Sequence, residues 1–551
     1  DPVTTAALVG MQADVEMRAG MLTRADSLYR RALAVLSDRD VPEVSWRLHA
    51  GRAEVLAARG RPATAERELE LAVAAIESGA AGAAFHRRGS FLLDKWQVYT
   101  RLASMQAKRG DVIAAFDTSE RMRAGRTLAT LAGGRIGQPV DDPSELQTRE
   151  QDLRRRMREI AARLYATADL PPSLREPPVA PSAADLESEL RRTQEEYGQV
   201  LDLIRQVDSG YADLVAPDTP GLDQVAARLA ADEIFVEYLV GETSTVAVVI
   251  NSDASDVLTL DIGREQLADL VFFARGAIER ERTGSDADLW AAPLRRLYAA
   301  LVGPIENAGW LDNKTRLVVA PHAELHYLPF QALIRDRDRV SFLVEELAIA
   351  YAPSASVWLR LNDRSGARGG DGLLALAPRS GDLPGSEYEV RAITSLLGQD
   401  PTVLVGREAT EQAFRQAAGD SDLAPGGTGD ARLEVHEVYE LELDARLVVL
   451  SACETGLGAG SQTNAPAGDD WVSLTRAFLS AGADNVVASL WRVEDLATAT
   501  LMEKFYRELG DGVALPDALA AAQRALIDDP DKAHPFYWAG FSLVGEARGS
   551  L

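Results

Sequence analysis

Cysteine is almost absent from this sequence, because Cys453 is the only one among 551 residues. A single thiol excludes an intramolecular disulfide framework and fits a reducing compartment. Apolar runs of the roughly 18 residues that a membrane-spanning helix needs are also missing, and the first residues show no signal-peptide pattern. We therefore expect a cytoplasmic protein with no membrane partner.

Basic residues are scarce relative to acidic ones. Lys and Arg together number 58 and Asp and Glu 84, so the formal net charge is −26. Phosphate binding needs clustered Lys and Arg, which argues against nucleic acid as a partner. An arginine run at residues 154–156 has acidic neighbours and is interpreted as the solvated face of a helix.

Cofactor and metal motifs are missing too. The sequence contains no Walker motif, GxSxG elbow or CxxC pair, and the glycines of residues 456–460 lack the GxGxxG spacing of a dinucleotide loop. His322 and His326 stand four positions apart, but prolines flank them and neither an HExxH motif nor a third ligand is visible. We therefore expect no cofactor and no metal.

Residues 1–135 carry an internal repeat. Gly20, Gly60 and Gly110 each follow one helical run and precede another, which predicts tight turns between paired helices. Small or apolar residues recur beyond each glycine at spacing i, i+4, i+7: Ala25, Tyr29 and Ala32; Ala65, Leu69 and Ala72; Ala115, Ser119 and Met122. The pattern resembles tetratricopeptide repeats with longer spacing. Such a stack can bind a regulatory protein or peptide on its concave face; the alternative is a platform for the rest of its own chain.

The remaining chain divides into three parts. Residues 136–215 have two apolar stripes on either side of a proline-rich break at 171–181, which predicts a helical hairpin or spacer. From residue 220 the composition favours strands, first at 234–240, 245–250 and 316–320. Strands and helices then alternate, which is typical of an α/β domain with a mostly parallel sheet. We place its two halves at residues 220–355 and 370–551.

Cys453 lies just beyond a short apolar run at residues 447–450, which reads as a buried strand ended by glycines. A rigid sheet can aim a thiol at such a strand end while the loop keeps the sulfur reachable, so Cys453 is a candidate nucleophile. The alternative is a small buried hydrophobe, the usual role of a free cysteine.

Three segments in order carry a resemblance to a known family: residues 451–456 (SACETG), 488–495 (ASLWRVED) and 534–541 (HPFYWAGF). Together they resemble the CHAT domain, a caspase-like, separase-related cysteine peptidase domain that usually follows tetratricopeptide repeats. The similarity spans about residues 220–551. It implies a pseudo-caspase half at 220–355 and a catalytic half at 370–551.

The resemblance also implies roles for single residues. Cys453 becomes the nucleophile, and its own backbone N–H with a neighbouring glycine amide holds the oxyanion. Asp495, with Glu494 second, matches the segment where separase-like peptidases place an acid that binds a basic P1 side chain. The alternative role of Asp495 is to cap the helix predicted at 496–509.

The catalytic histidine that the resemblance implies is missing. In the family it ends a strand between the strand at 402–405 and the cysteine strand, yet residues 414–436 hold no such strand. His436 is the nearest substitute but falls in a helical stretch, and His534 is assigned a packing role. Caspase-like sheets run in the order 2-1-3-4, so loss of strand 3 leaves a gap of about 10 Å. We infer that the natural protein has a further strand and loop near residues 419–423.

The resemblance implies regulated, limited proteolysis of a protein partner after a basic residue, with bacterial defence as one setting in the family. The rival hypothesis is a catalytically inactive scaffold that uses its repeats for binding. Presence of the missing histidine discriminates between the two, because a thiol without a base is a weak nucleophile near neutral pH.

Overall fold

The structure of the protein is a computed structural model. It describes residues 1–36, 41–82, 95–135, 219–280, 289–336, 340–364, 374–377, 384–397, 402–405, 443–491 without 451–470, and 493–549, with scattered single residues between 146 and 203 and between 408 and 441. The chain divides into two compact units, one from residues 1–106 and 121–219 and the other from residues 107–120 and 220–551. The hairpin predicted at 136–215 lies largely outside the described residues.

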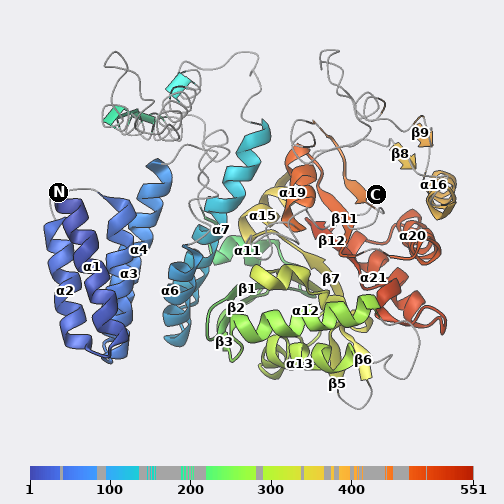
Figure 1. Cartoon of the computed structure of the whole chain (residues 1–551). Helices are drawn as coiled ribbons and strands as arrows, with labels where there is room; N and C mark the ends of the chain where they lie inside the picture. Colours follow the sequence, from blue (N-terminus) through green and yellow to red (C-terminus); the bar gives the residue numbers. More distant parts are fainter. Residues whose placement is uncertain are drawn as a thin grey trace. The chain divides into compact units, whose positions relative to one another are not determined.

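Paired antiparallel helices make up the first part of the chain (Figure 1). They are α1 (Pro2–Arg18), α2 (Leu22–Val35), α3 (Pro42–Ala58), α4 (Pro62–Gly82), α6 (Trp96–Lys108) and α7 (Val112–Arg135). Gly20, Gly60 and Gly110 turn the chain with φ between 71° and 76°, a conformation that costs glycine little. All nine residues of the predicted i, i+4, i+7 trios are buried. The repeat prediction is confirmed.

A single eight-stranded sheet organises the second unit. Its strands are β1 (Glu233–Val240), β2 (Thr245–Ile250), β3 (Ser255–Leu260), β4 (Arg316–Ala320), β7 (Ala348–Tyr351), β10 (Leu447–Leu450), β11 (Asn485–Ser489) and β12 (Phe541–Gly545). They lie in the order β10-β11-β12-β7-β4-β1-β2-β3. Parallel pairing links β1, β4 and β7, and also β10 and β11, whereas β12 is antiparallel to β11. The fold class, helical repeats followed by an α/β domain, is confirmed.

Helices alternate with these strands along the chain, as the colours of Figure 1 show. They are α11 (Leu222–Arg228), α12 (Arg264–Arg280), α13 (Ala291–Leu301), α14 (Gly303–Asn307), α15 (Ala355–Arg364), α19 (Trp471–Ala481), α20 (Asp495–Gly510) and α21 (Leu515–Ile527). Short 3-10 turns connect them: η2 (Ala323–Tyr327), η3 (Phe330–Ala332), η4 (Leu343–Glu345) and η8 (Pro535–Tyr537), with the hairpin of β5 (Ile334–Asp336) and β6 (Val340–Phe342). Helix α21 packs against β7 and β12, and α19 against β11.

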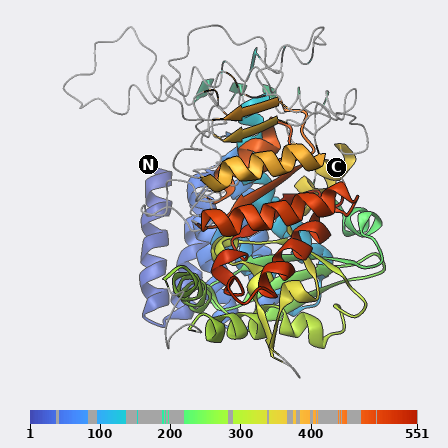
Figure 2. The ribbon, with the colours of Figure 1, turned by 90° about the vertical axis from the view of Figure 1, so that its right-hand side faces the viewer.

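A second, two-stranded sheet stands apart from the large one. Its strands, β8 (Leu374–Ala377) and β9 (Thr402–Val405), are parallel and are joined through α16 (Pro384–Leu397). Helix α16 packs against both β8 and α20, and Figure 2 shows it between the strand pair and α20. The division of the α/β unit into halves at residues 355 and 370 stays a prediction.

Residues of α7 belong to the α/β unit and are anchored in its core. Glu120, fully buried, accepts hydrogen bonds from the first backbone N–H groups of α15, at Ala355 (3.0 Å) and Ser356 (2.9 Å). Its neighbour Ser119 donates a hydrogen bond to the buried carboxylate of Glu237 on β1. A carboxylate at a helix N-terminus satisfies free donors and complements the helix dipole. The C-terminal part of the repeat region therefore caps a helix of the sheet domain.

Candidate active site

Two neighbouring parallel strands end at the predicted active site. β10 pairs with β11 in parallel, with Leu450 opposite Ala488 near their carboxyl ends. Because the carboxyl ends of parallel strands meet at the same edge of a sheet, Leu450 at the end of β10 and Ser489 at the end of β11 lie at one sheet edge. Asn485 fixes the start of β11: its buried amide donates to Arg446 O (3.3 Å) and accepts from Ala547 N (3.1 Å).

The segment after β11 is held in place by buried contacts. Leu490 N–H donates to the carbonyl of Gly540 at 2.8 Å, and the indole N–H of Trp491 donates to the carbonyl of Phe536 at 3.0 Å. The Trp491 side chain is 1% exposed and lies flat against Gly540, where a Cβ would sit 3.0 Å from the indole. The last two predicted motifs, 488–495 and 534–541, therefore pack against each other.

Arg275 on α12 is a residue at this edge that sequence reasoning missed. Its Nη2 donates to the Leu490 carbonyl at 2.9 Å, and its Nε donates to Glu279 at 2.6 Å. The guanidinium also stacks over Tyr327, 5.8 Å from the ring centroid. No sequence motif surrounds Arg275, so only the folded chain reveals that it orients the segment after β11.

The two predicted acids lie at the start of α20. Glu494 occupies the N-cap position and is exposed; its side chain makes no capping hydrogen bond, although its carbonyl accepts from Thr498 N at 2.9 Å. Asp495 is the first helical residue and is partly buried. The alternative in which Asp495 is the helix cap is therefore wrong by one residue. Negative charge in a first turn is favourable for the helix in either position.

Cys453, its backbone N–H and His436 lie outside the described residues, as do residues 419–423. The structure describes the positions of Glu494 and Asp495. The roles of Cys453 as nucleophile and of a histidine as base stay predictions. Cys453 follows Leu450, the last residue of β10, by three positions. The described chain before Cys453 thus ends at Leu450, at the same sheet edge as the end of β11.

Three other histidines, His322, His326 and His534, lie among residues that are not predicted site residues. His322 is 5% exposed, and its Nδ1 accepts from Val240 N at 3.1 Å. His326 lines a small pocket with Thr475 of α19, and none of the predicted site residues lines that pocket. His534 caps η8 by accepting from Phe536 N at 3.1 Å. Among the residues that the structure describes, no group of three or more His, Cys, Asp or Glu side chains is placed to hold a metal ion.

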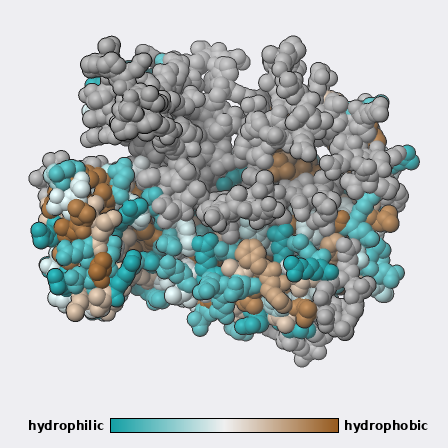
Figure 3. Space-filling model, viewed as in Figure 1, coloured by the Kyte–Doolittle hydropathy of each residue, from teal (hydrophilic) through white to brown (hydrophobic). Residues whose placement is uncertain are grey.

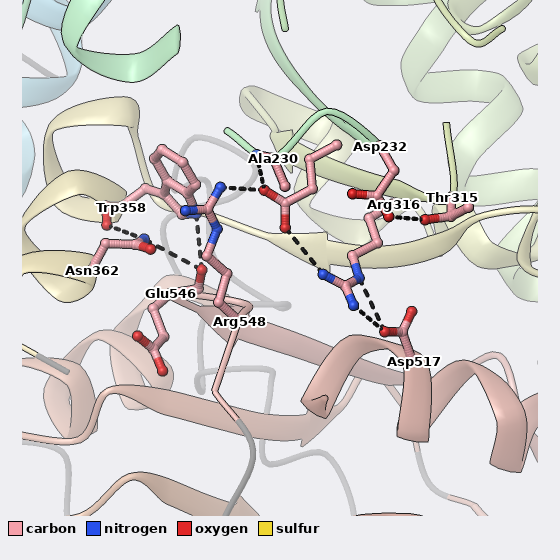
Figure 4. A network of polar contacts seen from close by, with 10 residues as sticks. Ala230, Asp232, Thr315, Arg316, Trp358, Asn362, Asp517, Glu546 and Arg548 are labelled. Carbon is pink, nitrogen blue, oxygen red and sulfur yellow. Dashed lines mark hydrogen bonds and ion pairs between the residues drawn. The ribbon is translucent and has the colours of Figure 1, made fainter. Parts of the chain in front are cut away.

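Elsewhere in the α/β unit, charged side chains pair with one another in a network of hydrogen bonds and ion pairs (Figure 4). Glu233 at the start of β1 accepts from Ala230 N (2.9 Å), from Arg316 (3.4 Å) and from Arg548. Arg316 also donates twice to Asp517 on α21, at 3.0 and 2.5 Å. The negative and positive charges of these side chains compensate one another. Their contacts link β1 and β4 to α21 and to the last described residues of the chain.

Hydrogen bonds in the same cluster shift the pKa values of two of its side chains. A hydrogen bond from the Thr315 hydroxyl lowers the pKa of Asp232 below its usual value, and hydrogen bonding to Asp517 raises the pKa of Arg316. Both shifts stabilise the charged forms. The guanidinium of Arg548 stacks on Trp358 at 5.2 Å, which adds a cation–π contact. The cluster is structural in character and contains no candidate nucleophile.

Comparison with known proteins assigns the α/β unit to a family. Residues 291–424 and 420–546 match the CHAT domain family. The protein class is thus one in which helical repeats precede a CHAT domain. The family match and the relatives named for tetratricopeptide repeats together support a TPR–CHAT protein.

Two curated relatives that are similar to part of the chain are named for tetratricopeptide repeats. Tetratricopeptide repeat protein 28 of Homo sapiens is 25% identical over 331 residues, and that of Mus musculus 24% identical over 330 residues. Each alignment covers 46% of this chain and 13% of the relative, so the chain spans a small part of their length.

Two solved structures match nearly all or about half of the chain at low identity. The separase–securin complex of Saccharomyces cerevisiae has a TM-score of 0.41 at 10% identity and covers 99% of this chain and 53% of that chain. The Arg-specific cysteine proteinase gingipain R has a TM-score of 0.33 at 10% identity and covers 52% and 74%. Both scores are below 0.5, so the family assignment rests on the sequence match.

In the described part of the chain, no helix is long and apolar enough to cross a membrane.

Proposed function

We propose that the protein is a caspase-like cysteine endopeptidase that cleaves a protein partner after a basic residue. The observation that carries this proposal is the parallel pairing of β10 with β11. The two strands end at one sheet edge, and Cys453 follows β10 by three residues in the sequence while Asp495 follows β11 by six. A nucleophile and a specificity pocket on adjacent strand ends suit a protease cleft.

The chemistry follows from a thiolate at that edge. The Cys453 sulfur attacks the peptide carbonyl, and backbone N–H groups, that of Cys453 among them, hold the oxyanion. A histidine takes the thiol proton and later gives it to the leaving amine, after which water hydrolyses the thioester. None of these steps requires a metal or an organic cofactor.

The histidine belongs on a strand that we place between β8 and β10. Within the described residues β10 is an edge strand, and β8 pairs with β9 in a sheet of its own. The apolar residues of β10 are only half-buried, whereas those of β11 are fully buried. The two segments that match the CHAT family meet at residues 420–424, at the point where the sequence lacks the expected strand. These observations support a further strand in the natural protein.

Asp495 is proposed to bind the basic P1 side chain, with Glu494 second. An Asp495→Asn variant is expected to lose at least about tenfold in kcat/KM for arginyl substrates, because a charge-assisted bond to a guanidinium contributes about 1.5–3 kcal/mol. The variant should remain folded, since asparagine is tolerated at a helix start. Glu494→Gln is the matched control and should have a smaller effect, since Glu494 is exposed. An unchanged preference for Arg over norleucine at P1 in both variants would remove the pocket assignment.

The experiment that tests the function is covalent labelling of the full chain with an arginyl acyloxymethyl ketone. Cys453 is the only cysteine, so peptide mapping assigns a thiol adduct without ambiguity. We expect about one label per chain, blocked by prior treatment with iodoacetamide. A norleucyl probe of the same reactivity is the control for P1 recognition. Equal labelling by both probes would contradict the basic P1 pocket, and no labelling by either would contradict the peptidase.

Regulation is the role we propose for the helical repeats. A repeat stack offers an extended surface for a protein or peptide, and α7 reaches the core of the α/β unit through Glu120. Binding there can be coupled to limited proteolysis, in a cytoplasmic setting such as bacterial defence. The alternative function, an inactive scaffold that binds through the repeats, is favoured by one observation: the sequence holds no histidine between the end of β10 and the start of α20.

A further inference from the structure

We propose that the outer face of α1 is a docking surface for a further helical hairpin of the same repeat type. This outer stripe consists of Leu8, Met11 and Val15, which are 61%, 64% and 65% exposed. Their spacing of three and four residues places them on one face of the helix. In Figure 3 apolar residues gather in brown on the exposed side of the first helices.

The opposite face of α1 is already used. Ala6, Gly10 and Ala13 are buried, and a Cβ on Gly10 would lie 2.5 Å from Leu48 of α3. Helix α1 is therefore apolar on two opposite faces. A helix of this kind is typical of a buried position, whereas the end of a finished repeat stack has a polar outer face.

The register of the repeat identifies what covers the stripe. Gly20 and Gly60 occupy the same turn position in successive repeats, so the stripe corresponds to Leu48, Gly51 and Val55 on α3. Leu48 and Val55 are 3% and 0% exposed and belong to one core cluster with residues of α1 and α2. The three positions that α1 leaves exposed are thus the positions through which α3 contacts the preceding helical pair.

The size of Met11 limits which hairpin fits. At the corresponding Gly51 the absence of a side chain makes room for Tyr29 of α2, since a Cβ there would lie 2.5–2.9 Å from the phenol. Methionine needs that space itself. The docking hairpin must therefore carry a small residue at the position equivalent to Tyr29.

Charge sets a second requirement. Arg52 of α3 and Arg59 at its C-cap pair with Asp26 of α2 at 3.1 and 2.8 Å. On α1 the corresponding residues are Gln12 and Ala19, which carry no charge. An acid equivalent to Asp26 would therefore lose both close cations and keep only the equivalent of Arg30 on its own helix, which lies 3.9 Å from Asp26, at a cost in stability. The partner is an apolar helical hairpin with a small residue at the position equivalent to Tyr29 and a neutral residue at the position equivalent to Asp26.

The test adds such a hairpin to the full chain. A copy of residues 1–40 is fused ahead of Asp1, with Tyr29→Ala and Asp26→Asn in the copy, so that the 40-residue repeat spacing is kept. We expect the melting temperature of the repeat unit to rise by about 5 °C. An unmodified copy should give no rise. Met11→Glu in the original α1 should abolish the rise, whereas Leu71→Glu, at a 50% exposed apolar residue of α4, should leave it intact.

A second measurement does not depend on melting. Met11→Cys in a Cys453→Ala background provides one thiol on the stripe, and its alkylation should slow at least about tenfold in the fused protein. An unchanged alkylation rate, or equal melting with both copies, would overturn the proposal. Dimers of the unfused chain that Met11→Glu dissociates would also overturn it, because a second copy would then be the occupant.

Discussion

A Cys453→Ala variant of the full chain is expected to lose peptidase activity on arginyl substrates by about 10⁴-fold or more. Removal of the nucleophile leaves only binding and oxyanion stabilisation, which contribute little without a covalent step. Cys453→Ser is the matched control: it keeps the size and polarity of the side chain, yet a serine beside a histidine tuned for a thiol remains a poor nucleophile. Circular dichroism of both variants should match the wild type, because neither substitution removes a large side chain.

The contrary outcome separates two explanations. If wild type and Cys453→Ala hydrolyse the substrate equally slowly, the intact mass of the protein from its natural source becomes decisive. A mass above 59.4 kDa supports the further strand with its histidine and makes the inactive form incomplete. A mass of 59.4 kDa together with inactivity favours the scaffold, because the strand next to β10 would then be missing in the natural protein.

Much of the fold could be predicted because local patterns determine it. The strands predicted at 245–250 and 316–320 have the bounds of β2 and β4, since their runs of β-branched and apolar residues are unambiguous. The turn glycines were found from their spacing. β3 escaped prediction because it is an edge strand with mixed burial, and β7 because its four residues are too short for a periodicity.

The site was less accessible to prediction for a physical reason. Arg275 orients Leu490 through a bond that spans 215 positions, and no local pattern encodes such a contact. The helix start was misplaced by one residue at Asp495, since Glu494 and Asp495 are both acceptable next to a helix N-terminus. The motif 488–495 could be found because it resembles a segment of the CHAT domain. The pocket role of the acids remains a prediction.

Replacing Trp491 by alanine is expected to lower the free energy of unfolding of the α/β unit by about 3–5 kcal/mol. The indole is 1% exposed, fills the space above Gly540 and donates to the Phe536 carbonyl at 3.0 Å. Its removal creates a cavity between the two motifs and leaves that carbonyl without its donor. Denaturant titration of the full chain, followed by tryptophan fluorescence and circular dichroism, measures the loss.

Trp491→Phe separates the two contributions. It keeps most of the ring volume and removes the N–H, so a loss of about 1–2 kcal/mol is expected. Trp310→Ala, at a partly exposed position beyond α14, is the control for tryptophan loss as such and should cost about 1 kcal/mol. If Trp491→Ala costs no more than Trp310→Ala, the two motifs do not stabilise each other. The segment after β11 would then depend on Arg275 and on the hydrogen bond from Leu490 N–H to the Gly540 carbonyl, and the packing argument for a rigid Asp495 at the sheet edge would fail.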